Sequence, residues 1–293
     1  MRLLITGASG LLGHKIRALA ESQGHQALGI YNLHEVTGNG MMKRDLTDAS
    51  AASSLISETK PDVVINTASF TDVDRCESEF ETASAVNGRM PGILAKTCAQ
   101  CGAMMLHVST DYVFDGQRGN YKESDPPHPI NRYGRSKLEG EIQVARNARD
   151  YCIARTSAVY GWGRSHRQNF ATWMLNKWRQ HEEVKAVTDQ FVSPTLNINL
   201  AQMLLEVAER RITGTIHLSG STRMSRHEFA MMLARKFNFD EALVMAATSV
   251  SLGWLALRPR DSSLDVSKAS HELGNKPFPI EAALDKFYEE TIV

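Results

Sequence analysis

Thr6-Gly7-Ala8-Ser9-Gly10-Leu11-Leu12-Gly13 is the stretch that decides the fold of this 293-residue chain. Residues 2–5 form an apolar run typical of a short buried strand, and residues 14–23 have the amphipathic pattern of a helix. In that setting the first glycine permits a tight turn with positive φ, the second lets a phosphate approach the backbone, and the third lets helix and strand pack closely. The helix start also offers N–H groups to an anion. The stretch therefore predicts a nucleotide-binding turn, with an ordinary strand-to-helix turn as the alternative.

The composition is that of an ordinary globular protein, with 42% hydrophobic and 23% charged residues and 33 basic residues balanced by 33 acidic ones. A net charge of zero argues against nucleic acid or a membrane surface as an electrostatic partner, although a local basic pocket for a phosphate stays compatible with it. There is neither a signal-peptide pattern nor an apolar run of about 20 residues, so we expect no membrane span and a cytoplasmic location. Four cysteines are too few for a disulfide scaffold.

Strand-like and helix-like segments alternate over the first 160 residues. A proline at position 91 predicts a kink or break near Arg89 in a long helical stretch at 79–101. Continuous apolar strands separated by helices are typical of a parallel sheet covered on both faces, so we predict an α/β fold with a Rossmann-type doubly wound parallel sheet. The predicted strands are 27–31, 62–66, 104–108 and 151–155, and the predicted helices include 49–59, capped by Asp48, and 137–149.

The pattern changes after about residue 160. Helices are predicted at 169–180, 198–210 and 225–237, the last with Ser225 and Glu228 as a capping box, and strands at 184–187 and 214–218. We therefore expect a nucleotide-binding domain over 1–160, with a returning segment near 188–212. A smaller C-terminal α/β domain over 161–293 would mainly bind the substrate, with the site between the two.

A second group of residues carries acid–base chemistry. Ser109 and Thr110 lie where a strand ends, at the carboxyl edge of the sheet, where open α/β folds bind ligands. Tyr133 and Lys137 are four residues apart at a helix start and so share one face. A nearby ammonium favours the phenolate, so the phenol would release its proton more readily near neutral pH. The set suits a ketone that takes a hydride on carbon and a proton on oxygen, whereas the alternative is a common surface pair.

Several motifs resemble one protein family. Residues 109–116, Ser-Thr-Asp-Tyr-Val-Phe-Asp-Gly, together with the glycine turn and the Tyr-x-x-x-Lys pair, are similar to the extended short-chain dehydrogenase/reductases and, more narrowly, to dTDP-4-dehydrorhamnose reductases. The same motifs occur in the regulatory β subunit of methionine adenosyltransferase, which the glycine turn resembles equally. The other stretches that carry the resemblance are 70–77, 131–134, Asp189-Gln190, Pro194-Thr195 and Arg258-Pro259.

The resemblance implies a role for each matching residue. Tyr133 would donate the proton, Lys137 would activate it and bind the ribose, and Thr110 would polarise the reacting oxygen. Arg258 would meet a substrate phosphate, unless it forms an ion pair with an acid such as Asp261. The implied catalytic set is Tyr133, Lys137, Thr110 and Ser109. The implied cofactor ligands are Gly7, Ser9, Gly10, Leu11, Leu12, Gly13, Asp45, Leu46, Thr67, Ala68, Ser69, Tyr133 and Lys137. The implied substrate ligands are Thr71, Val73, Thr110, Asp111 and Arg258.

Charged residues predict which cofactor is bound and whether a metal site is present. An acidic residue at the end of the second strand would accept a ribose hydroxyl and repel a 2′-phosphate. Residues 31–34 contain none before Glu35, and Lys43 and Arg44 lie just beyond, which favours NADP(H) over NAD(H). The acids at 72–77 favour a helix cap over a metal, so no metal site is expected.

Two interpretations stay open. In the first, the protein is an enzyme that reduces the C4 ketone of a dTDP-4-dehydro-6-deoxyhexose in dTDP-rhamnose synthesis, or another nucleotide-sugar reductase or epimerase. In the second, it is an NADP-binding regulatory subunit with methionine adenosyltransferase as its partner. The reductases often place a tryptophan where this chain has Ala158, which leaves sugar recognition open. A homodimer is also left open.

Overall fold

The computed structural model describes residues 1–33, 39–163 and 168–291. Its centre is a sheet of seven parallel strands in the order β11-β6-β5-β4-β1-β2-β3. This order reverses direction between β1 and β4, and it confirms the predicted doubly wound sheet. The strands are β1 (Arg2–Thr6), β2 (Gln26–Tyr31), β3 (Met41–Lys43), β4 (Val63–Asn66), β5 (Met104–Thr110), β6 (Tyr151–Thr156) and β11 (Gly214–His217).

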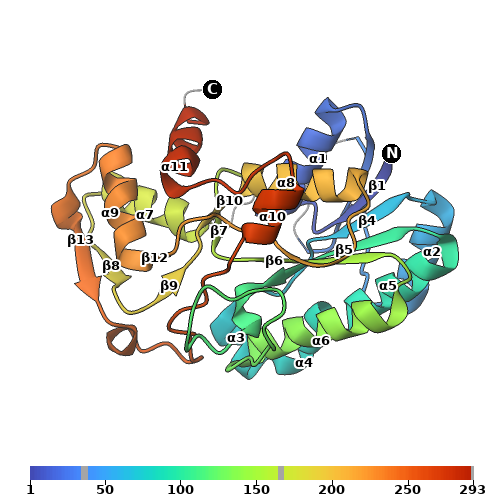
Figure 1. Ribbon diagram of the computed structural model, residues 1–293, viewed down its shortest axis with the longest axis horizontal. Helices are drawn as coiled ribbons and strands as arrows, with labels where there is room; N and C mark the ends of the chain where they lie inside the picture. Colours follow the sequence, from blue (N-terminus) through green and yellow to red (C-terminus); the bar gives the residue numbers. More distant parts are fainter. Residues whose placement is uncertain (34–38, 164–167, 292–293) are drawn as a thin grey trace.

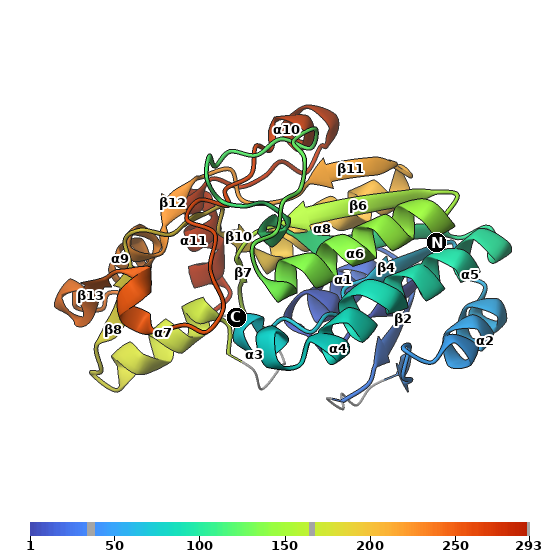
Figure 2. The same cartoon turned by 90° about the horizontal axis from the view of Figure 1, so that it is seen from below.

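Alternating side chains of the central strands build two separate cores. Leu3 and Ile5 of β1 face one side of the sheet, whereas Leu4 between them faces the other. The first side is covered by α1 (Leu11–Ser22) and α8 (Asn197–Glu209), which lie above the sheet in Figure 1. The second side is covered by α2 (Ala49–Thr59), α5 (Met90–Cys101) and α6 (Arg132–Asn147), which cross the sheet in Figure 2.

The long helical stretch at 79–101 is interrupted, as the proline predicts. After α3 (Val73–Ser78), α4 (Phe80–Ala83) is followed by a π-helical turn (Ser84–Arg89), and α5 begins at Met90 with Pro91 in its first turn. The predicted caps Asp48 and Asp72 are also present, because each carboxylate accepts a backbone N–H of the helix that it starts.

Two boundaries matter for the site. The helix start predicted at Tyr133 and Lys137 is confirmed, because α6 begins at Arg132, where the side chain of Asn131 accepts the N–H of Gly134 at 2.8 Å and caps the helix. The strand predicted to stop at 108 continues to Thr110. Tyr133 therefore lies in the first turn of α6, and Ser109 and Thr110 are the last two residues of β5.

The second part of the molecule has a core of its own, seen at the left of Figure 1. Tyr160, Trp178, Phe229 and Phe287 fill it, and the predicted capping box of Ser225 and Glu228 starts α9. Its helices are α7 (Phe170–Arg179), α9 (Arg226–Lys236) and α11 (Ile280–Glu289). Its strand pairs are β7 (Val159–Tyr160) with β10 (Thr195–Leu196), β8 (Val184–Val187) with β13 (Val244–Ala247), and β9 (Phe191–Val192) with β12 (Met224–Ser225).

The chain returns to the large core after residue 196. Helix α8 packs on α1, β11 joins the edge of the central sheet, and α10 (Ser267–Glu272) contributes Ala269 to the same core. Among helices built from described residues, none is both long and apolar enough to span a membrane.

Candidate active site

Most of the predicted site residues lie at one edge of the sheet. The glycine turn follows β1, residues 67–69 follow β4, and Thr110 ends β5, and these three strands are neighbours in the sheet. Because the strands are parallel, their carboxyl ends meet at this edge. Asp45 and Leu46 follow β3, two strands away on the far side of β1.

The glycine turn has the shape that a pyrophosphate requires. Gly7 has φ +66°, and a Cβ there would lie 2.8 Å from the backbone of Ala68. A Cβ on Gly13 would lie 2.4 Å from the carbonyl oxygen of Gly7. Gly10 is the N-cap of α1, whose first N–H groups have no acceptor within the helix. The residues present therefore fit the phosphates of a dinucleotide, with Ser9, Leu11 and Leu12 between the glycines.

The strand ends beside this turn are held by short hydrogen bonds. The Thr67 hydroxyl donates to the carbonyl of Thr6 at 2.7 Å, and the Ser69 hydroxyl donates to Asn87 Oδ1 at 2.8 Å. The first bond ties Thr67 to the end of β1, and the second ties Ser69 to the π-helical turn before α5.

The outer cofactor residues differ in exposure. Asp45 is exposed and accepts the N–H and hydroxyl of Thr47, which hold the pKa of this carboxyl below its usual value, whereas Leu46 is buried. Lys43 and Arg44 are both exposed beside it, and Glu35 lies outside the described residues.

The structure brings Tyr133 to Thr110. Thr110 is among the groups that act on the phenol of Tyr133, whose ring meets the ring of Tyr112 edge-on with centroids 5.8 Å apart. Burial raises the pKa of Tyr133 above its usual value, the Thr110 side chain opposes this rise, and the charge of Asp111 adds to it.

Lys137 is anchored to the strand that carries Thr110. Its Nζ is buried and donates to the carbonyl of Val108 at 2.8 Å. Burial lowers the pKa of Lys137 to about 8, an effect that the charge of Glu141 opposes. The ammonium can donate three protons and Val108 takes one.

The structure turns Ser109 away from Tyr133, which corrects its place in the catalytic set. Successive residues of a strand face opposite sides of the sheet, so Ser109 and Thr110 cannot both face the phenol. The Ser109 hydroxyl instead donates to Glu141 Oε1 at 2.5 Å, in the interior. Glu141 also forms a buried ion pair with Arg155, with Oε2 2.7 Å from Nη2. Ser109 thus belongs to a buried polar cluster.

Asp111 lies in the interior, not on an open wall. It is only 2% exposed and begins a 3₁₀ turn (Asp111–Val113) directly after β5. Its Oδ1 accepts from Thr110 at 3.0 Å, and its Oδ2 accepts from Ser157 at 2.8 Å and from Ser262 at 2.5 Å. Sequence reasoning missed both serines. Ser157 directly precedes Ala158, where the reductases often have a tryptophan, whereas no pattern in the sequence marks Ser262.

Arg258 forms an ion pair, but not with Asp261. Its two Nη atoms lie 3.0 Å from the two oxygens of Asp74 in α3, and Asp74 also accepts the N–H of Ala256. Asp261 is paired with Arg223 instead. Thr71 is exposed just before α3, and Val73 is the first residue of α3. These two predicted substrate ligands therefore adjoin the ion pair of Arg258 and Asp74.

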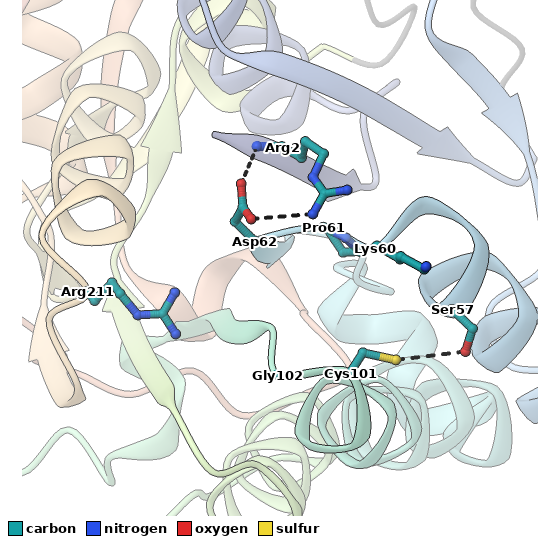
Figure 3. A pocket seen from close by; sticks show the side chains of 8 residues that line it. All are labelled: Arg2, Ser57, Lys60, Pro61, Asp62, Cys101, Gly102 and Arg211. Carbon is teal, nitrogen blue, oxygen red and sulfur yellow. Dashed lines mark hydrogen bonds and ion pairs between the residues drawn. The ribbon is translucent and has the colours of Figure 1, made fainter.

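A hollow of about 370 Å³ lies at the opposite edge of the sheet, where the strands begin (Figure 3). Helices α2 and α5 end there, so its cations complement the negative ends of two helix dipoles. Neither the glycine turn nor Tyr133 lines it. Its lining residues are Arg2, Ser57, Lys60, Pro61, Asp62, Cys101, Gly102 and Arg211.

Curated relatives match nearly the whole chain. A "probable low-salt glycan biosynthesis reductase" of Haloferax volcanii is 38% identical, covering 94% of this chain and 93% of its own. The dTDP-4-dehydrorhamnose reductase of Aggregatibacter actinomycetemcomitans is 35% identical, covering 97% of both chains. Methionine adenosyltransferase 2 subunit beta of Pongo abelii is 33% identical, covering 91% and 81%.

Solved structures agree with these relatives. A hypothetical dTDP-4-dehydrorhamnose reductase from Sulfolobus tokodaii is 40% identical with a TM-score of 0.86, covering 95% of this chain and 97% of its own. The Bacillus anthracis dTDP-4-dehydrorhamnose reductase in complex with NADP is 29% identical with a TM-score of 0.89, covering 99% of both. The model of the RmlD substrate binding domain matches residues 1–293. This chain belongs to the RmlD substrate binding domain family.

Proposed function

We propose that the protein is an NAD(P)H-dependent reductase of a nucleotide sugar. It would reduce the C4 ketone of a dTDP-4-dehydro-6-deoxyhexose, as in dTDP-rhamnose synthesis. One observation carries the proposal: the phenol of Tyr133 meets Thr110 at the sheet edge that holds the glycine turn, in a chain similar to reductases over nearly its whole length. A phenol at that place is positioned to protonate a carbonyl oxygen.

Each residue at the sheet edge would have its own role in the proposed reaction. The bound cofactor would supply a hydride to the ketone carbon. Tyr133 would give its proton to the ketone oxygen, and Asn131 fixes the helix turn from which the phenol projects. Lys137, with Val108 as one acceptor, would offer its other protons to the ribose. The glycine turn would hold the pyrophosphate.

The cofactor preference and the domain roles are part of the proposal. We favour NADP(H), supported by the exposed side chains of Lys43, which ends β3, and Arg44, which follows it, and by the similar Bacillus anthracis reductase in complex with NADP. Residues 161–293 would mainly bind the nucleotide sugar. A cytoplasmic location and a homodimer are proposed with it, and the mass of the protein in solution tests the homodimer.

Cofactor oxidation at 340 nm with dTDP-4-dehydrorhamnose tests the proposal. We expect turnover with NADPH to exceed turnover with NADH. Replacing the phenol in Tyr133→Phe should lower kcat by about 100-fold or more with cofactor affinity kept, since the general acid is lost. A Tyr133→Phe variant that turns over as fast as the parent would refute the mechanism.

A regulatory role is the second candidate, favoured by the 33% identical β subunit of methionine adenosyltransferase. Ala158, at the position where reductases often carry a tryptophan, adopts a left-handed φ of +42°. In this reading the protein binds NADP(H) and a methionine adenosyltransferase without turning over keto sugars. Co-purification with that enzyme, and no oxidation of NADPH by any dTDP-keto sugar, would favour it over the reductase.

A further inference from the structure

A row of three polar side chains crosses the interior of the central sheet. Thr6 of β1, Asn66 of β4 and His107 of β5 are directly opposite one another on neighbouring parallel strands, so they share one face of the sheet. None of the three is exposed to solvent. The residues two positions earlier on this face are apolar core residues: Leu4, Val64 and Met105. A polar row in such a place is tolerated only when its members bond to one another.

The hydrogen bonds along the row run in one direction. The Ala68 N–H donates to Thr6 Oγ1 at 3.4 Å, and the Thr6 hydroxyl donates to Asn66 Oδ1 at 2.5 Å. Asn66 Nδ2 in turn lies 3.0 Å from His107 Nδ1. An amide nitrogen can only donate, so Nδ1 accepts and the imidazole carries its proton on Nε2. With the amide of Asn66 reversed, the buried Thr6 hydroxyl would lose the acceptor that the structure gives it.

The row ends beside the glycine turn. Thr6 directly precedes Gly7, and a Cβ on Gly7 would lie 2.8 Å from the backbone of Ala68, so the ends of β1 and β4 are in close contact. The Thr67 hydroxyl adds a bond of 2.7 Å to the carbonyl of Thr6. The spacing between the turn and residues 67–69 therefore depends on what holds Thr6 and Asn66 together.

We infer that His107 is a positioning residue for the cofactor site. By accepting from Asn66 it fixes the amide that receives the Thr6 hydroxyl, and so it sets the approach of Ala68 to the glycine turn. Without this acceptor, Asn66 Nδ2 would be a buried donor free to turn away, and the bond to Thr6 would be lost with it. The inference deepens the proposed function and rests on the NADP(H) site at this edge of the sheet.

The surroundings of His107 suit an acceptor. Burial lowers the pKa of His107 well below its usual value, and the charge of Lys137 lowers it further, so the ring stays neutral. Its Nε2 faces α6, where a Cβ on Gly140 would lie 3.3 Å away, and this nitrogen has no hydrogen-bond partner among the described residues. In that part of the chain, the bond to Asn66 is thus the one that orients the ring.

The test is the Kd for NADPH, measured by fluorescence titration of the parent, His107→Leu and His107→Asn. The leucine removes the acceptor, whereas the asparagine can place its Oδ1 where Nδ1 lay. We expect His107→Leu to raise the Kd about tenfold and His107→Asn to keep it within about threefold of the parent. An unchanged Kd in His107→Leu, or an equal loss of affinity in both variants, would overturn the inference.

Met105→Leu is the matched control. Met105 lies two residues earlier on β5, is equally buried and faces the same core, but it belongs to no polar row. Met105→Leu should lower the midpoint of thermal unfolding and leave the Kd for NADPH within about twofold of the parent. A loss of affinity in Met105→Leu that equals the loss in His107→Leu would assign the effect to general packing and overturn the inference.

The parent protein offers a readout that requires neither a folded leucine variant nor turnover. Protonated and bare imidazole nitrogens have well-separated ¹⁵N resonances, and those of His107 are assigned by their loss in His107→Asn. We expect a bare Nδ1 and a protonated Nε2 at pH 7. A proton on Nδ1 would reverse the row and overturn the inference.

Turnover separates this inference from the proposed function. A parent that binds NADPH but reduces no keto sugar would refute the reductase, and the Kd comparison would still decide the role of His107. A lowered kcat at saturating NADPH with an unchanged Kd in His107→Leu would place the ring in the chemical step and overturn the inference. A parent that binds no NADPH would overturn both.

Discussion

Glu141 is the single residue whose charge should be most costly to remove. Its carboxylate is paired with Arg155, both side chains are about 5% exposed, and it also accepts the hydroxyl of Ser109. Glu141→Gln keeps the shape but leaves the guanidinium without its counter-charge in the interior. We expect a loss of about 3–5 kcal/mol in the free energy of unfolding, measured by urea denaturation.

A surface pair provides the matched control at the residue scale. Arg211 and Asp150 lie 2.8 Å apart with about half of each side chain exposed. Solvent screens such a pair, so Asp150→Asn should cost less than about 1 kcal/mol. If Glu141→Gln were no more costly than Asp150→Asn, the buried cluster around Ser109 would not contribute to stability as argued.

At the scale of elements, the contact between β1 and α1 depends on Gly13. A Cβ there would lie 2.4 Å from the carbonyl oxygen of Gly7, and backbone cannot yield as a flexible side chain does. Gly13→Ala should therefore push α1 away from the turn, cost about 1–3 kcal/mol of stability and weaken NADPH binding about tenfold. Thermal unfolding and NADPH fluorescence titration measure the two effects.

A substitution at Gly24, beyond the other end of α1, distinguishes the loss of stability from the loss of NADPH affinity. Its φ is +80° and no neighbour lies within 4 Å of an added Cβ, so Gly24→Ala strains the backbone without touching the turn. It should lower stability by about 1 kcal/mol and leave NADPH affinity unchanged. Equal losses of affinity in Gly13→Ala and Gly24→Ala would show that general destabilisation, not the turn, controls binding.

For the whole molecule, local patterns predict the sheet better than they predict the site. The apolar runs and the glycine turn predict a parallel, doubly wound sheet, because strand periodicity and turn geometry are local properties. The choice between Ser109 and Thr110 depends on which face of β5 each side chain occupies, and the folded chain decides this by placing Glu141 beside Ser109. Partners such as Ser262 for Asp111 or Asp74 for Arg258 lie more than 150 residues away, and only the folded chain brings them together.

The segment after α10 is fastened to the large core by one carboxylate of α8. Glu206 of α8 accepts the N–H groups of Gly274 and Asn275, at 2.6 and 2.7 Å, and pairs with Arg210. These donors favour the carboxylate and outweigh its burial, so the pKa of Glu206 falls from 4.5 to about 2. The resulting stabilisation is complete above pH 4.5 and is lost as the pH falls toward 2, worth about 3 kcal/mol.

Glu206→Gln should remove this pH dependence. We expect the difference in unfolding free energy between parent and variant to be largest near pH 6 and to shrink steadily between pH 4.5 and 2, measured by urea denaturation at each pH. Glu209→Gln is the control, because that carboxylate lies three residues along α8, is 43% exposed and pairs with His25 at the surface. A difference for Glu206→Gln that stays constant across this range would mean that the segment after α10 is held by shape and backbone contacts. A difference that shrinks for Glu206→Gln and stays small for Glu209→Gln would show that one carboxylate charge fastens this segment to the nucleotide-binding core.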